Sequence, residues 1–206
     1  MQTRHGMRTL IGSTAVMTAF VIGVHASAQE PAEHGARHQQ VEMPTSGVRA
    51  ELLGDLDILE EKYTSLAEAT TAHYAWRPAE GVRSVSEVFM HIAGANLYIP
   101  TIFGVDAPEG MEVASLEEAF GRMQEMEKVT EPAEVMERLS AGIAHARHAI
   151  VSVPDTELDT EIMLFGQPAT KRTGLILLVS HMHEHLGQAV AYARMNGVVP
   201  PWSAGG

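Results

Sequence analysis

The sequence predicts an all-α protein: a four-helix bundle with one short extra helix and long inter-helix loops. Apolar residues recur at three- and four-residue steps in four long segments, the spacing of one buried helix face. Ala, Leu, Val and Met supply most of the apolar side chains while aromatic residues make up only 5% of the chain, and this composition favours helices over sheets. With 206 residues, 45% of them hydrophobic, the chain can bury the core of one domain without any cysteine.

Residues 1–28 have the pattern of a secretory signal peptide. Two arginines give a positively charged start, residues 10–24 are apolar and uncharged, and residues 26–28 (Ala-Ser-Ala) form a small-x-small cleavage site. The apolar stretch is too short and too polar for a confident membrane span. We therefore expect cleavage after Ala28, a periplasmic or secreted mature protein, and no membrane association once the leader is removed.

Residues 29–45 show no apolar periodicity and are expected to form a flexible linker before the bundle, residues 46–206. His34 and His38 lie in this linker, where a solvated tether is the simpler interpretation and a metal-scavenging tail is the alternative. Removing the leader takes away two arginines and no acid, so the net charge moves from −12 to −14. A chain this acidic repels phosphate backbones, which argues against nucleic acid as a partner.

The first helix is expected to begin after Ser46, whose hydroxyl can cap it, and to fade near residues 69–71. Its apolar stripe consists of Leu52, Leu53, Leu56, Leu59, Tyr63 and Leu66. In the loop that follows, Trp76, Arg77 and Pro78 are expected to clamp the turn against the bundle. A substrate contact by Arg77 is the alternative.

The second helix has a clear start, because Ser84 and Glu87 have the spacing of a capping box. Its apolar side consists of Val85, Val88, Phe89, Ile92 and Leu97. Pro100 cannot donate a backbone hydrogen bond, so the helix should end or kink near it. The capping role already accounts for Glu87.

After a long loop, a second capping box, Ser115 with Glu118, opens the short extra helix, which is expected to run to about Lys128. Pro132 suits the first turn of the third long helix. That helix is expected to end just before Pro154.

Residues 155–170 lack helical spacing, and residues 161–165 are expected to form a short extended segment. The fourth long helix should run from about Thr173 to Met195. Residues 196–197 (Asn-Gly) then provide a left-handed C-terminal stop.

The fourth long helix carries the sharpest feature of the sequence. His181 and His185 lie one turn apart and continue the apolar face that Leu177 and Leu178 begin. Side chains at i and i+4 lie one above the other and can chelate one ion. His183 lies two residues from each, so it should point to the opposite side. The alternative for the pair is two ordinary buried histidines with hydrogen-bond partners.

A third ligand has to come from another helix, since ligands on facing helices converge in the core of a bundle. His91 is the best candidate, because it lies beside the buried stripe of the second helix. His145 and His148 fall between the apolar positions of the third long helix and are expected to face solvent. His73, at the frayed end of the first helix, is a weaker candidate.

Two groups of motifs resemble one known family. The first group comprises YAWRP at 74–78, GVRSVSE at 81–87 and HIA at 91–93 with Asn96. The second comprises HxxEHxGQ at 181–188, YAR at 192–194 and GVVPP at 197–201. In this order and at these distances, the motifs resemble the DinB-like (YfiT-like) superfamily over residues 47–203.

This resemblance implies a four-helix bundle whose second helix supplies one metal-binding histidine and whose fourth helix supplies two. The matching positions in this sequence are His91, His181 and His185. The export signal departs from the family's better-known cytoplasmic thiol transferases. A homodimer is compatible with the resemblance.

Three neutral imidazoles without a thiolate suit one divalent ion: Zn, Ni, Fe, Co or Mn. Such a site keeps positions open for water or substrate, and it can lower the pKa of bound water toward about 7 or polarise a carbonyl. Glu184 is expected to orient a ligand or act as general base, with a solvent-facing carboxylate as the alternative. Gln188 and Tyr192 either line the pocket mouth or pack in the core, and Asn96 either supports the site or packs.

Two classes of function remain. The first is a metal-dependent enzyme with an unknown small-molecule substrate: a hydrolase or, by family analogy, a transferase or isomerase that uses a small thiol. Small thiols are scarce where an exported protein works, which weakens the thiol branch. The second class is a non-catalytic metal- or ligand-binding bundle. An enzyme requires an open metal position beneath a pocket, whereas a fourth protein ligand closes a carrier or structural site.

Overall fold

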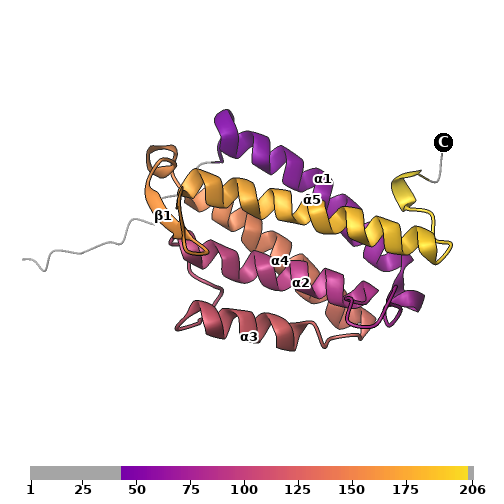
Figure 1. Cartoon of the computed structure of the whole chain (residues 1–206). Coiled ribbons are helices and arrows are strands. Elements are labelled where there is room, and N and C mark those ends of the chain that lie inside the picture. The colour runs from indigo at the N-terminus through magenta and orange to yellow at the C-terminus, as the bar shows by residue number, and fades with distance from the viewer. Residues whose placement is uncertain (1–42, 204–206) are drawn as a thin grey trace, which may run out of the picture. The chain divides into compact units, whose positions relative to one another are not determined.

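In the computed structural model, which describes residues 43–203, five α-helices and one small hairpin form the chain's main elements (Figure 1). The helices are α1 (Gly47–Ala69), α2 (Val85–Tyr98), α3 (Leu116–Met126), α4 (Pro132–Ser152) and α5 (Lys171–Met195). Short 3₁₀ turns occupy Thr71–His73, Ile99–Phe103, Asp155–Glu157 and Pro201–Ser203. The predicted signal peptide and most of the predicted linker lie outside the described residues.

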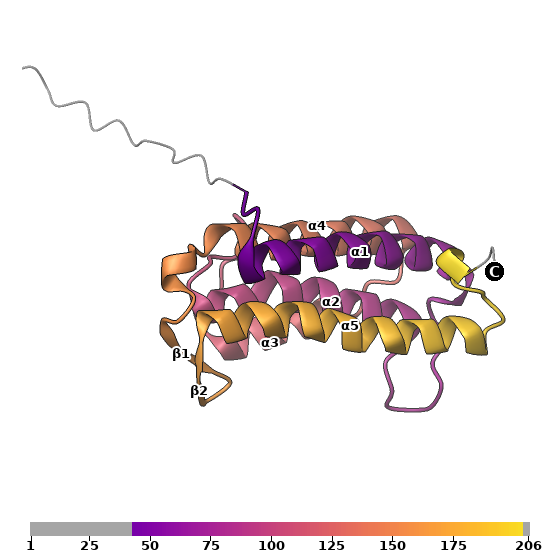
Figure 2. The same cartoon turned by 90° about the horizontal axis from the view of Figure 1, so that it is seen from above.

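The predicted all-α class is confirmed, and the four long helices lie alongside one another. Both α1 and α2 contact α4 and α5, while α3 lies against α2 (Figures 1 and 2). The second helix therefore has α3, α4 and α5 as neighbours. Among the residues described, none of the helices combines the length and apolar character that a membrane crossing requires.

The ends of the helices follow local capping rules, with two corrections. At α2, Ser84 and Glu87 form the predicted capping box. At α3, the Ser115 hydroxyl accepts from the Glu118 amide as expected, but the Glu118 carboxylate accepts the amide of Ala114. Ser46 occupies the N-cap position of α1, yet its side chain makes no capping hydrogen bond. Position alone therefore did not determine whether a serine caps its helix.

Residues 161–170 form a two-stranded hairpin, of which the sequence predicted only the first strand. β1 (Glu161–Leu164) pairs antiparallel with β2 (Gln167–Thr170). Phe165 and Gly166 between them both have positive φ, at 50° and 81°, which is the requirement of a type I′ hairpin turn. β2 contains Pro168, and proline is depleted in strands. The composition of this segment therefore did not predict a strand.

One glycine sets how closely α4 approaches α2. A Cβ atom on Gly142 would lie 2.7 Å from the carbonyl oxygen of Ala93 and 2.8 Å from its Cα, so a larger residue there would push the helices apart. Ala93 lies two residues after His91. The close contact therefore supports the part of α2 that carries this histidine.

Candidate metal centre

Three histidine rings from two helices converge at one point. His91 comes from α2, and His181 and His185 come from consecutive turns of α5. Each ring offers one nitrogen that lies within 4.8 Å of the corresponding nitrogens of the other two. The ring centroids lie 4.6 to 5.2 Å apart. The structure thus brings together the three residues that the sequence singled out.

The polar partners of two rings indicate which nitrogen is left to bind a metal. His91 Nδ1 lies 2.9 Å from the Glu127 carboxylate, and His185 Nδ1 lies 2.8 Å from the side-chain oxygen of Gln188. Both partner atoms accept hydrogen bonds, so each Nδ1 carries the proton and each Nε2 keeps its lone pair. Gln188 in turn donates to the hydroxyl of Tyr192 at 2.8 Å.

The third ring has no such partner. Among the residues that the structure describes, His181 Nδ1 is buried without a hydrogen-bond partner. Its Nε2 lies 3.3 Å from His91 Nε2. Two nitrogens that each lie about 2.0–2.1 Å from a tetrahedral Zn are separated by about 3.3 Å. The facing nitrogens therefore fit a shared cation, and the donor set of three imidazoles suits a divalent metal.

The electrostatics of the cluster favour the neutral form of its two α5 rings. Burial, assisted by the charges of His185, His91 and Arg83, lowers the pKa of His181 to about 4. Burial also lowers the pKa of His185, assisted by His91 and Arg83 and opposed by Gln188 and Glu184. Only neutral imidazole binds a metal, so the lowered pKa values of these two rings favour metal binding.

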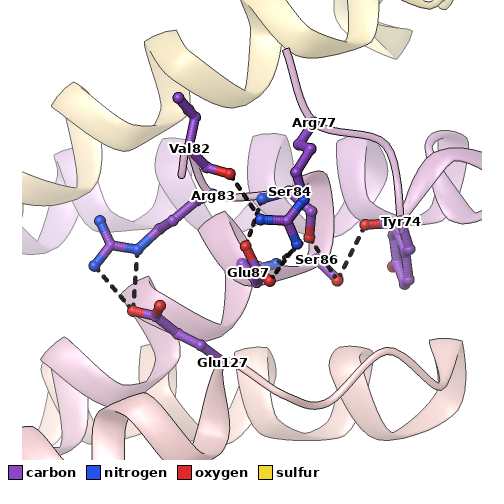
Figure 3. A network of polar contacts seen from close by, with 8 residues as sticks. All are labelled: Tyr74, Arg77, Val82, Arg83, Ser84, Ser86, Glu87 and Glu127. Atoms are coloured by element: carbon purple, nitrogen blue, oxygen red, sulfur yellow. Dashed lines mark hydrogen bonds and ion pairs between the residues drawn. The ribbon is translucent and has the colours of Figure 1, made fainter. Parts of the chain in front are cut away.

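Glu127, at the C-terminal end of α3, is a site residue that the sequence analysis missed. Its carboxylate holds His91, and it also accepts from Arg83 Nε and Nη2, both at 3.0 Å (Figure 3 shows the Arg83 contacts). Burial alone would raise the pKa of Glu127, but the hydrogen bond from His91 and the charge of Arg83 lower it below its usual value. The carboxylate therefore stays ionised as an acceptor for the ring.

The residues around the cluster leave it open. Among the described residues, the group of potential ligands contains the three histidines and no fourth side chain. All three histidines are partly exposed, and a nearby pocket of about 590 Å³ is lined by residues that contact two of the rings, not by the histidines themselves. Arg83, Glu127 and Gln188 line this pocket, and Glu127 and Gln188 contact the rings directly.

The other predicted site residues lie outside the cluster. His183 faces away, as predicted, and contacts Asp55 at 2.8 Å. Glu184 is exposed on α5 next to His185. Asn96 is buried and donates to the sulfur of Met182. His73 lies in the 3₁₀ turn after α1 and is not part of the cluster.

One prediction about α4 was wrong. His145 was expected to face solvent, but only 7% of the residue is exposed, whereas His148 is exposed as predicted. The buried stripe of α4 is wider than its large apolar residues indicated, because Gly142, Ala146 and Ala149 also pack inward. His145 lies on this wider face.

In the loop before α2, Trp76 and Arg77 make contacts of the predicted kind, whereas Pro78 is exposed. Arg77 donates to the carbonyl of Val82 at 2.9 Å and to Glu87 at 2.7 Å (Figure 3). Trp76 packs edge-on against Tyr192, with ring centroids 5.5 Å apart. The loop therefore joins the start of α2 to the C-terminal half of α5, near the helix turns that carry the cluster.

Comparisons with known proteins place this geometry in a family. A family model described as the DinB superfamily matches residues 55–189, a range that includes all three histidines. Among solved structures, the chain is similar to a DinB-like protein from Bacillus cereus ATCC 10987. That match has 18% sequence identity and a TM-score of 0.49, and it covers 74% of this chain and 95% of the other. No curated protein matches the chain.

Proposed function

The chain belongs to the DinB superfamily, and we propose that it is an exported metal-dependent hydrolase of a small molecule, with one divalent ion held by His91, His181 and His185. The observation that carries this proposal is the open cluster: three partly exposed rings, no fourth protein ligand among the described residues, and a pocket lined by the partners of two of the rings. A site closed by a fourth ligand would favour a structural or carrier role.

A divalent ion held by three imidazoles supplies a Lewis acid that polarises substrate and lowers the pKa of coordinated water. The chain's own groups position this site. Glu127 and Gln188 fix the rings of His91 and His185 through their Nδ1 protons. Glu184 is the neighbour of His185 on α5, and its carboxylate is our candidate for the general base that the sequence predicted.

Elemental analysis of the purified mature chain tests the metal site. We expect about one divalent ion per wild-type chain and only background metal in His181→Ala, because two imidazoles hold such an ion much more weakly than three. His183→Ala is the matched control, since it removes a histidine of the same helix that lies outside the cluster. Equal metal content in wild type and His181→Ala would refute the proposal.

The hydrolytic part of the proposal needs its own measurement. A panel of ester, amide and lactone substrates should be hydrolysed by metal-loaded wild type and not by the chelator-treated protein, with activity restored when metal is returned. We expect Glu184→Gln to keep its metal and lose about 10²–10⁴-fold in kcat if Glu184 is the base. A metal-loaded protein that hydrolyses none of the panel would leave a binding role as the better explanation.

Export is tested by sequencing the N-terminus of the protein recovered from outside the cytoplasm of a bacterial host. The mature chain should begin at Gln29, the residue after the predicted cleavage site. A protein that stays in the cytoplasm with its leader intact would contradict this part of the proposal.

A further inference from the structure

The pocket beside the histidine cluster has an unusual charge for this protein. Its wall contains three cationic side chains, Arg77, Arg83 and Lys128, and two carboxylates, Glu87 and Glu127. The wall is therefore net positive, although the whole chain has a net charge of −12. A local excess of cations in an acidic protein does not follow from its composition, so it calls for a specific explanation.

Two of the three cations are already engaged. Arg77 uses its guanidinium to hold the carbonyl of Val82 and the carboxylate of Glu87 (Figure 3). Lys128 is highly exposed and pairs with Glu125 at 2.6 Å. The carboxylates that they pair with, Glu87 and Glu125, are not the ones that hold the rings, so neither cation is tied to the cluster through its partner.

Arg83 is different, because its partner Glu127 also holds the ring of His91, and the guanidinium still has free donors. Its Nε and Nη2 both contact a single oxygen of Glu127, each at 3.0 Å (Figure 3). Among the described residues, Nη1 of Arg83 has no hydrogen-bond partner, and 38% of the side chain is exposed. A guanidinium has five N–H donors, so several remain free for an oxyanion from the pocket.

The free donors lie next to the histidine cluster. Arg83 binds the Glu127 carboxylate, which also holds the ring of His91. Glu127 therefore links the guanidinium of Arg83 to the imidazole of His91. The positive charge of Arg83 also lowers the pKa of both His181 and His185. A ligand bound to Arg83 from the pocket would therefore lie near the ring of His91, with only Glu127 between them.

We propose that the pocket binds small molecules that carry a carboxylate or another oxyanion, and that Arg83 is the residue that binds this group. This inference names the substrate class of the hydrolase proposed above. It rests on that proposed function, since the bound molecule is a substrate only if the protein is a hydrolase. The binding step itself depends on the guanidinium and can be measured without metal. The failure of one proposal can thus be separated from the failure of the other.

Calorimetric titration of the metal-free mature protein tests the inference. The probes are acetate, succinate, benzoate and inorganic phosphate, with succinamide as the uncharged counterpart of succinate. We expect at least one anion to bind and succinamide not to bind. Replacing Arg83 by Gln should weaken anion binding by about 10- to 100-fold, the range expected for the loss of a charge-assisted hydrogen bond. Arg83→Lys keeps the positive charge but loses the planar arrangement of N–H donors, so it should retain part of the affinity.

Arg172→Gln provides a closely matched control. Arg172 contacts a single oxygen of Asp159 through Nε and Nη2, at 3.1 and 2.9 Å, and 41% of its side chain is exposed. It does not line the pocket. Circular dichroism should show the same helix content in all variants.

The inference is overturned if Arg83→Gln and Arg172→Gln weaken binding equally, since the effect would then reflect net charge alone. It is also overturned if Arg83→Gln binds like wild type, or if none of the anions binds wild type with a Kd below about 10 mM. Metal content is measured in parallel. Anion binding that depends on Arg83 in a protein that never takes up metal would support this inference while refuting the metal-dependent function.

Discussion

Two groups of histidines in this molecule have nearly the same local spacing and very different surroundings. His181 and His185 lie four residues apart on α5, and His145 and His148 lie three residues apart on α4. The ring centroids of the first pair are 4.6 Å apart and those of the second pair are 5.8 Å apart. Among the residues that the structure describes, only the first pair meets a third histidine from a facing helix.

The surrounding groups explain the difference. In the cluster on α2 and α5, the Nδ1 atoms of His91 and His185 have acceptors, which leaves the Nε2 atoms free. On α4, His145 Nε2 is buried with no hydrogen-bond partner among the described residues, and the exposed His148 contacts Ser152 on its own helix. Close spacing on one helix therefore does not make a site; a facing ligand and oriented rings do.

The sharpest way to test this comparison is to remove one ring from each group. We expect His91→Ala to reduce bound metal to background and to abolish any rise in Tm on adding Zn or Ni, because a ligand stabilises only the state that binds it. His145→Ala should keep the metal content and the rise in Tm of wild type. Metal loss from His145→Ala, with His91→Ala unaffected, would reverse the assignment of the two groups.

A smaller effect is expected when an orienting partner is changed and the ligands are kept. Glu127→Gln should weaken metal binding by about 10- to 100-fold, the usual cost of losing a carboxylate that orients a ligand histidine. Glu125→Gln is the control on the same helix, since Glu125 forms only an exposed ion pair with Lys128. Competition titration with a coloured chelator gives both affinities. If the two variants bound metal alike, Glu127 would have no orienting role.

The smallest effect concerns the pH dependence of stability. Burial lowers the pKa of His145, and the charge of His148 lowers it further. The unfolded chain therefore takes up a proton at a higher pH than the folded chain does. This contribution to the free energy of unfolding is fully present above about pH 6.5 and is lost as the pH falls through the lower folded-state pKa.

His145→Leu removes this titration, so we expect its stability to fall less on acidification than that of wild type. Urea unfolding of the metal-free proteins at about pH 7.5 and pH 5.5 gives the comparison, because these values bracket the ordinary histidine pKa. Equal losses of stability in the two proteins would mean that His145 does not remain neutral when buried.

Local sequence features predicted the helices well where the determining interactions are also local. The capping box of Ser84 and Glu87, the position of Pro132 in the first turn of α4, and the Gly197 stop with its φ of 74° all involve residues within one turn of each other. Apart from the capping groups of Ser46 and Glu118, the errors have a different origin. The burial of His145 depends on which helices pack against α4, and β2 forms because it pairs with β1.

The sequence by itself determined the helix boundaries and the placement of His181 and His185 on one face, since a helix repeats every 3.6 residues whatever surrounds it. With the family resemblance it also named His91. Only the tertiary structure decided that His91 Nε2 lies 3.3 Å from His181 Nε2 and that Glu127, 36 residues along the chain, holds the other side of that ring. Such contacts depend on how α2, α3 and α5 pack against one another, and that packing results from the whole core rather than from the spacing within any single helix.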